Sequence, residues 1–278
     1  MISVADVSKI IPIGFIVIAL GWRYISVPLH LRKALWSAAN PFVRMADQRL
    51  PPDVKRELGV KSQTLISLGF NPIDATVCRK PYGRIESVYI FVFENRKTAD
   101  IATLYALSAG KDSGNLTTSL FCIFVRAFSN KTSIVTGNRC TESFPRRTNG
   151  ANCLSLRAPS NLSMLYTVHA SRTFRHQRDH AVIIIPESKL IDELQTAYVE
   201  DCEYSVARGC LKRTVLPPGY QPSLKGAFIW GWLELWPMKN IRRFSEDRRA
   251  DKALRSLGFC GIHAYYDNET LDESVPLL

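Results

Sequence analysis

Near its start the chain carries an uninterrupted apolar run, Ile10–Trp22 (IIPIGFIVIALGW), bounded by Lys9 and Arg23. A helix of this length covers about 20 Å, whereas the hydrocarbon core of a bilayer is roughly 30 Å thick. The flanking cations can extend toward the headgroups, and apolar residues continue past Arg23 as far as Leu29. The run therefore predicts a single transmembrane helix within residues 1–30. An interfacial helix, a buried core helix and a cleaved signal peptide are the alternatives, the last being least consistent because no basic cluster precedes the run.

The charges on either side of the run predict its orientation. Residues 1–9 carry one acid and one base, whereas residues 23–44 carry four bases and no acid. Because cytoplasmic flanks hold an excess of Lys and Arg, we expect the N-terminus outside and the main domain in the cytoplasm, at the inner (cell) membrane. Trp22, Arg23 and Tyr24 are then predicted to lie at the membrane interface, where aromatic rings and cations are favoured.

Composition agrees with a folded domain behind this segment. The chain has 278 residues, of which 46% are hydrophobic and 22% charged, enough to bury one good-sized core. Its net charge of +11 favours an anionic membrane surface or nucleic acid as a partner. Many of the bases stand beside apolar aromatic segments, and no nucleic-acid-binding motif is present, so the membrane is the favoured partner. The seven cysteines occur singly, without CxxC, which is typical of reduced cytoplasmic thiols.

Beyond the run, the sequence predicts an α+β domain. Residues 31–52 form a basic connector, residues 53–266 the cytoplasmic domain, and residues 267–278 an acidic tail. The predicted strands are 75–80, 87–94, 117–128, 132–136 and 181–185, the predicted helices are 53–68, 160–172, 186–206 and 245–257, 100–108 suits either state, and 138–160 is loop-like. Tight turns between successive strands predict an antiparallel β-meander covered by helices, following the N-terminal single transmembrane helix.

A second segment, 225–239, also suggests contact with a membrane. Within it, Gly226–Pro237 (GAFIWGWLELWP) holds three tryptophans and one phenylalanine between Lys225 and Lys239. The segment is too short to span a bilayer, but tryptophans flanked by cations are typical of interfacial helices. A core helix under the sheet is the equal alternative. The predicted interface residues here are Trp230, Trp232, Trp236, Lys239, Arg242 and Arg243.

No motif predicts a cofactor or a metal. Nucleophile elbows, phosphate loops and dinucleotide-binding loops are all absent from the sequence. His169, His176 and His180 would lie within about 60° of one another on a continuous helix, but the glutamate of HExxH is missing and cations surround them. His169, expected on the packed side of its helix, is the one weak catalytic candidate. The acids at 200, 201 and 203 are expected to be a solvated face.

Three segments resemble an uncharacterised group of bacterial membrane-associated proteins of planctomycete type. They are Phe124–Asn138, the later Leu165-Tyr166-x-x-His169, and Lys225–Pro237, and together they cover about a third of the chain. The resemblance implies membrane association and a similar fold, and carries no activity with it.

The sequence therefore predicts a single-pass, membrane-anchored bacterial protein of unknown biochemical activity. The leading hypothesis is a non-enzymatic interaction or scaffolding module with an unidentified protein partner at the cytoplasmic membrane face. One alternative is a membrane-bound enzyme with a pocket between sheet and helices, for which His169 is the first residue to test. The other alternative is a basic surface that binds anionic lipid or nucleic acid.

Overall fold

A computed structural model describes residues 21–33, 36–37, 43–44, 50–82, 85–109, 118–138, 150–157, 161–215 and 218–260. Most of the apolar run, the acidic tail and most of the connector lie outside these residues, so the predictions made for them do too. Residues 21–31, at the end of the predicted anchor, are helical. Among the described helices, none combines the length and the apolar character needed to cross a bilayer.

A seven-stranded sheet forms the centre of the domain, in the order β2-β3-β4-β5-β6-β7-β8. Its strands are β2 Val43–Arg44, β3 Asn71–Tyr82, β4 Ile85–Asn95, β5 Asp100–Ala109, β6 Thr118–Ala127, β7 Ser133–Gly137 and β8 Ala151–Ser155. Neighbours from β2 to β7 are antiparallel, whereas β8 is parallel to β7. The predicted α+β class and the meander are thus confirmed, with one parallel strand added.

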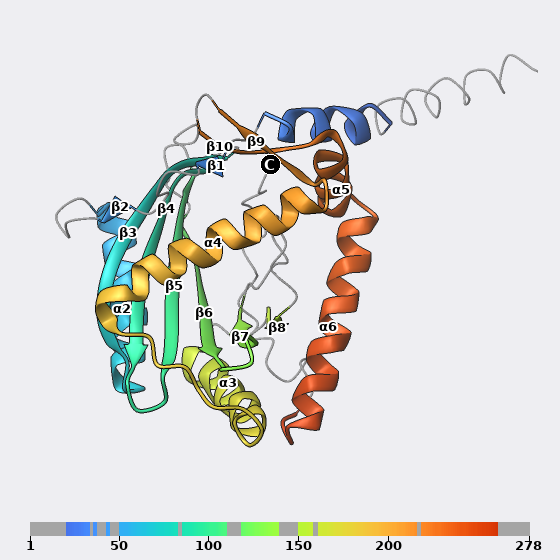
Figure 1. The fold of residues 1–278 in the computed structure, drawn as a ribbon. Helices are drawn as coiled ribbons and strands as arrows, with labels where there is room; N and C mark the ends of the chain where they lie inside the picture. Colours follow the sequence, from blue (N-terminus) through green and yellow to red (C-terminus); the bar gives the residue numbers. More distant parts are fainter. Residues whose placement is uncertain are drawn as a thin grey trace, which may run out of the picture.

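Helices cover both faces of this sheet, and a small second sheet lies at one end (Figure 1). The helices are α2 Pro52–Ser67, α3 Leu162–Gln177, α4 Leu190–Ala207 (preceded by the 3-10 turn Glu187–Lys189), α5 Leu224–Glu234 and α6 Met238–Ser256. The small sheet pairs β1 Trp36–Ser37 with β10 Gly219–Pro222, and β10 with β9 Leu211–Thr214.

Strict alternation along the strands gives each face of the large sheet its own core. On β5, Ala102 and Leu104 face α2, α3 and α6 in the main core, while Ile101 faces α4. Because side chains alternate between faces of a strand, continuous apolar strands such as β5 and β6 require cover on both sides. Figure 1 shows α4 crossing one face of the sheet, with α2 on the opposite face.

A separate core joins the helical segment 21–31 to the small sheet and to α5. It contains Leu31, Cys202, Leu211, Tyr220 and Trp230. Segment 21–31 and α5 touch so closely that a Cβ at Gly231 would lie 2.7 Å from Cγ of Pro28. Glycine at this position therefore permits the two helices to pack.

Two segments differ from the sequence prediction. The buried strand expected at 181–185 is wrong: only Val182 forms a bridge, to Phe128, and Ile184 is 71% exposed. Residues 150–157, expected to be loop, contain β8, which is held by parallel pairing to β7. Neither outcome is visible in local periodicity, because each depends on a partner strand elsewhere in the chain.

Two helices are longer than expected. α3 continues to Gln177 and α6 begins at Met238, before the expected cap Ser245. The turns added to α3 are mostly polar, whereas those added to α6 mix cations with the exposed apolar residues Met238, Ile241 and Phe244. In both cases the packing of the neighbouring turns holds them in the helix.

Candidate functional site

The predicted catalytic candidate His169 belongs to a buried polar cluster centred on Asp100. Arg126 of β6 donates to Asp100 of β5 from Nε to Oδ1 at 2.5 Å and from Nη2 to Oδ2 at 2.6 Å. Tyr166 donates its hydroxyl to Oδ2 at 3.0 Å, and Nε2 of His169 lies 3.3 Å from Oδ1. The Asp100, Arg126 and His169 side chains are all at most 6% exposed.

The cluster continues from His169 to β7 and β8. Nδ1 of His169 lies 3.1 Å from Oγ1 of Thr136, and that oxygen also accepts from Nη1 of Arg172 at 2.6 Å. Arg172 also donates to the carbonyl oxygens of Val135 and Asn152. Since an ionised Asp100 can only accept, we infer that His169 carries its proton on Nε2 and that Thr136 donates to Nδ1.

The pKa values agree with this arrangement. Burial lowers the pKa of His169, which favours the neutral imidazole. Burial raises the pKa of Asp100, but the hydrogen bonds from His169 and Arg126 outweigh it and bring that pKa down to about 2. Burial and the nearby Asp100 charge raise the pKa of Tyr166 to about 12. Asp100 is therefore ionised beside a neutral histidine and a charged arginine.

This arrangement has the connectivity of an Asp–His–hydroxyl triad, but Thr136 and His169 are both 0% exposed. A nucleophile must reach its substrate, and none of these residues lines either cavity described below. The cluster's evident effect is to fasten α3 to β5, β6 and β7.

Of this cluster, the sequence indicated only His169. Sequence reasoning did not identify Asp100 and Arg126, although each is a charged residue near the end of a largely apolar strand. From this pattern the two residues could have been predicted to form an ion pair, because a charge in such a strand requires a partner once it is buried.

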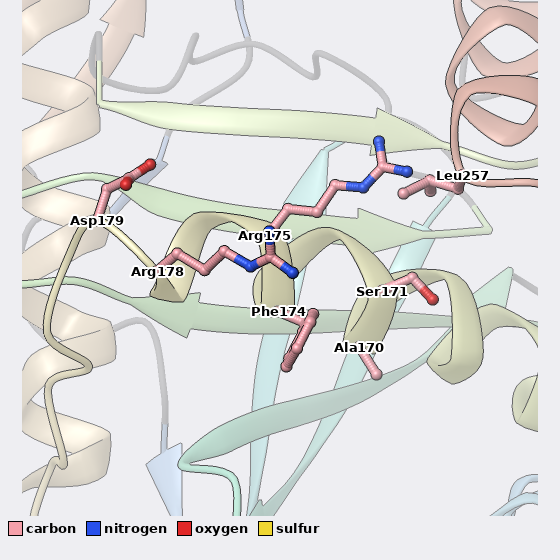
Figure 2. Close-up of a pocket in the computed structure, with 7 residues that line it drawn as sticks. All are labelled: Ala170, Ser171, Phe174, Arg175, Arg178, Asp179 and Leu257. Carbon is pink, nitrogen blue, oxygen red and sulfur yellow. The ribbon is translucent and has the colours of Figure 1, made fainter.

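An open hollow of about 890 Å³ lies along the C-terminal half of α3, and Figure 2 shows seven residues that line it. Arg175 extends toward Leu257 at the end of α6 and donates to the carbonyl oxygen of Ser256 at 2.7 Å. The guanidinium of Arg178 stacks over the ring of Phe174 at 5.3 Å. The hollow is lined by two arginines and by Asp179, and both arginines already contact protein groups.

Of the three histidines expected to share a helix face, only His176 and His180 lie close together. The rings of His176 and His180 are 4.6 Å apart, and Nε2 of His176 lies 3.0 Å from Oγ1 of Thr132. His169 is instead fully buried, with its ring 5.8 Å from that of Phe124. Among the described residues, no three His, Cys, Asp or Glu side chains are placed to hold a metal ion.

A cavity of about 300 Å³ lies on the opposite face of the sheet, under α4. Its floor is apolar and includes Ile123, Val125 and Val135. From α4, Glu200 and Asp201 contribute to its lining, whereas Glu203, the third acid of that group, bonds Tyr220 and pairs with Arg213 instead. The three acids therefore do not form a single solvated face.

Segment 21–31, α5 and the start of α6 lie at one end of the molecule in Figure 1, and each of them carries exposed apolar side chains. We call this surface the apolar end; its members are Trp22, Ile25, Leu29, Trp232, Trp236, Met238, Ile241 and Phe244. Trp236 is 70% exposed, whereas Trp230 is 8% exposed and belongs to the core. Of the other residues predicted for the interface, Arg23 is exposed, and Tyr24, Lys239, Arg242 and Arg243 are half-buried.

Beyond Phe244 the outward side of α6 changes from apolar to cationic. Arg248, Arg249 and Lys252 are exposed there, and the Arg248 guanidinium lies over the Phe244 ring at 5.7 Å. Arg255 is also exposed but pairs with Asp251. Aromatic and aliphatic groups followed by long cationic side chains suit the boundary between acyl chains and headgroups.

Comparison with known proteins adds no relative to this picture. No protein-family model, curated protein or solved structure matches the chain.

Proposed function

We propose that this chain is a single-pass, membrane-anchored interaction module, without catalytic activity, whose α+β domain lies against the cytoplasmic face of the cell membrane. Residues 1–30 supply the anchor, and the apolar end rests at the level of the lipid headgroups. The remaining surface of the domain is then available to a protein partner.

The contact between Pro28 and Gly231 is the observation that carries this proposal. It places the helix that continues the predicted anchor directly beside α5, the helix that leads to Trp232 and Trp236. Eight large apolar side chains, each at least 40% exposed, thereby gather at one end of the molecule. Exposed apolar side chains grouped on neighbouring elements in this way are typical of an interaction site, and the tryptophans and neighbouring cations favour a membrane.

Tryptophan fluorescence offers a test that keeps the chain intact. The full chain would be reconstituted into vesicles of phosphatidylcholine and phosphatidylglycerol whose acyl chains are brominated. Two variants would each retain one of the five tryptophans, with the other four changed to Phe. One variant retains Trp236 and the matched control retains Trp230, which lies six residues earlier but is buried in the protein core.

We expect strong quenching of Trp236 and weak quenching of Trp230, because bromine quenches only rings that reach the acyl chains. Equal quenching of both, or none at Trp236, would overturn the proposed membrane contact. Circular dichroism of both variants would establish that each is folded.

A further inference from the structure

Helix α4 packs on two different cores, one toward each of its ends. Its first turn packs on the large sheet, where Leu190 and Ile191 meet the side chains of Ile90 and Val92. Its last turns pack on the small sheet and α5 through Cys202. Between these two contacts the helix spans the sheet, and the cavity lies beneath it.

The cavity is large enough for a small molecule. At about 300 Å³ it holds the volume of about ten water molecules, at the lower end of the range for ligand sites. Six of its strand residues are Ile or Val and one is Ala, whereas Thr76, Thr103, Tyr105 and Ser133 carry hydroxyl groups. Since Thr103 already donates to the carbonyl of Ile123, this floor favours an apolar ligand body.

The cavity lining is acidic, although the molecule as a whole is basic. The chain contains 36 basic and 25 acidic residues. Among the described residues that line the cavity, however, the charged ones are Glu200 and Asp201, both on α4. Carboxylates beside a low-dielectric cavity attract a cation and repel an anion.

We propose that this cavity binds a small apolar molecule of about ten non-hydrogen atoms that carries one protonated amino group. The apolar body lies against Ile123, Val125 and Val135, and the ammonium donates to the carboxylate of Glu200 at the α4 side. This proposal does not depend on membrane attachment, because no residue of the apolar end lines the cavity.

Three water-soluble probes of similar size separate the contributions of shape and charge. They are 2-phenylethylamine, 2-phenylethanol and phenylacetate, titrated calorimetrically into the full chain. We expect the amine to bind most tightly, the alcohol about five- to tenfold more weakly, and phenylacetate not measurably.

Variants on α4 assign this binding to the cavity. Glu200→Gln should weaken amine binding about five- to tenfold and leave the alcohol unchanged. Glu193→Gln is its matched control, since Glu193 lies two turns earlier on the same helix and does not line the cavity. Ala197→Trp should abolish binding of both probes by filling the cavity, whereas Ala207→Trp, on the same helix and away from the cavity, should not.

The proposal is overturned if phenylacetate binds as tightly as the amine, or if no probe binds at millimolar concentration. Amine binding that survives Ala197→Trp would also overturn it, because the probe would then bind elsewhere. Thermal unfolding of each variant verifies that a loss of binding is not a loss of fold.

Discussion

At the scale of single residues, the carboxylate of Asp100 is the acceptor at the centre of the buried polar cluster. It accepts hydrogen bonds from Arg126, Tyr166 and His169, which come from a neighbouring strand and from α3. A buried charge is tolerated when its hydrogen-bonding capacity is satisfied in this way. His169 then needs no charge of its own, because its neutral form donates from Nε2 to Asp100 and accepts at Nδ1 from Thr136.

A neutral buried histidine makes stability depend on pH. The pKa of His169 in the fold lies below its ordinary value of 6.5, so below that pH the unfolded chain binds a proton that the fold excludes. The free energy of unfolding should therefore fall as pH drops below about 6.5, by at most about 1.4 kcal/mol per pH unit from this group. In His169→Gln this part of the slope should disappear, as measured by urea unfolding between pH 7.5 and 5. An unchanged slope in the variant would contradict the neutral assignment.

At the scale of elements, the same six-residue pattern ends two helices in the same way. Leu65–Phe70 and Leu254–Phe259 share the sequence Leu-x-Ser-Leu-Gly-Phe. In each, the Phe N–H donates to the carbonyl of the first Leu at 3.0 Å, and the glycine has a φ near +85°. This is the Schellman arrangement, in which glycine takes the left-handed conformation that closes a helix. Local sequence alone determined these two helix ends.

The packing of segment 21–31 against α5 leads to a prediction for Gly231→Ala. The added methyl group would lie 2.7 Å from Cγ of Pro28 and 3.2 Å from its nitrogen, so segment 21–31 must move away from α5. We expect a loss of about 1–3 kcal/mol in the free energy of unfolding. Gly59→Ala is the control: Gly59 lies within α2 with no atom within 4 Å of its added Cβ, so the change should stabilise by about 0.5–1 kcal/mol. Urea unfolding of both variants decides this, and a loss for Gly59→Ala or a gain for Gly231→Ala would contradict it.

Whether the sequence predicts an element depends on how far apart in the chain the interacting residues lie. The packed side of α3 was predictable because Leu162, Leu165 and Val168 recur at helical spacing, and all three are buried. β8 was not predictable, because Asn152 and Cys153 are exposed and its pairing with β7 is parallel. The ion pair between Asp100 and Arg126 joins residues 26 positions apart, and the cavity under α4 arises from contacts at the two ends of that helix. Such features depend on the assembled fold.

At the scale of the whole molecule, charge is distributed unevenly over the surface. The outward side of α6 is cationic beyond the apolar end, while the cavity lining carries acids. An anionic bilayer attracts juxtamembrane cations by about 1 kcal/mol each. The proposed membrane contact therefore predicts that the protein prefers anionic lipid, and that the cations of α6 cause this preference.

This preference can be measured with Arg248→Gln/Lys252→Gln in the full chain. In the chain reconstituted as described above, loss of the two charges should reduce the quenching of Trp236 by brominated phosphatidylglycerol at low salt, with less effect at high salt. Tryptophan fluorescence measures it. Lys55→Gln/Arg56→Gln, which removes two exposed cations from α2, should have little effect. An equal loss for both pairs would show that only net charge matters.

The position of Asp100 opposite Arg126 also bears on how the sheet assembles. Ile101 pairs with Val125 in the β5–β6 ladder, so the two charged residues are cross-strand neighbours on the α3 face. If β5 slipped by one residue, every side chain on it would change faces. Asp100 would then face the apolar core under α4. Arg126 would remain on the α3 face without a carboxylate to pair with. A chain with the wrong register would thus hold an unpaired buried charge on each side of the sheet. The free-energy cost of these two charges disfavours the wrong register while the sheet forms.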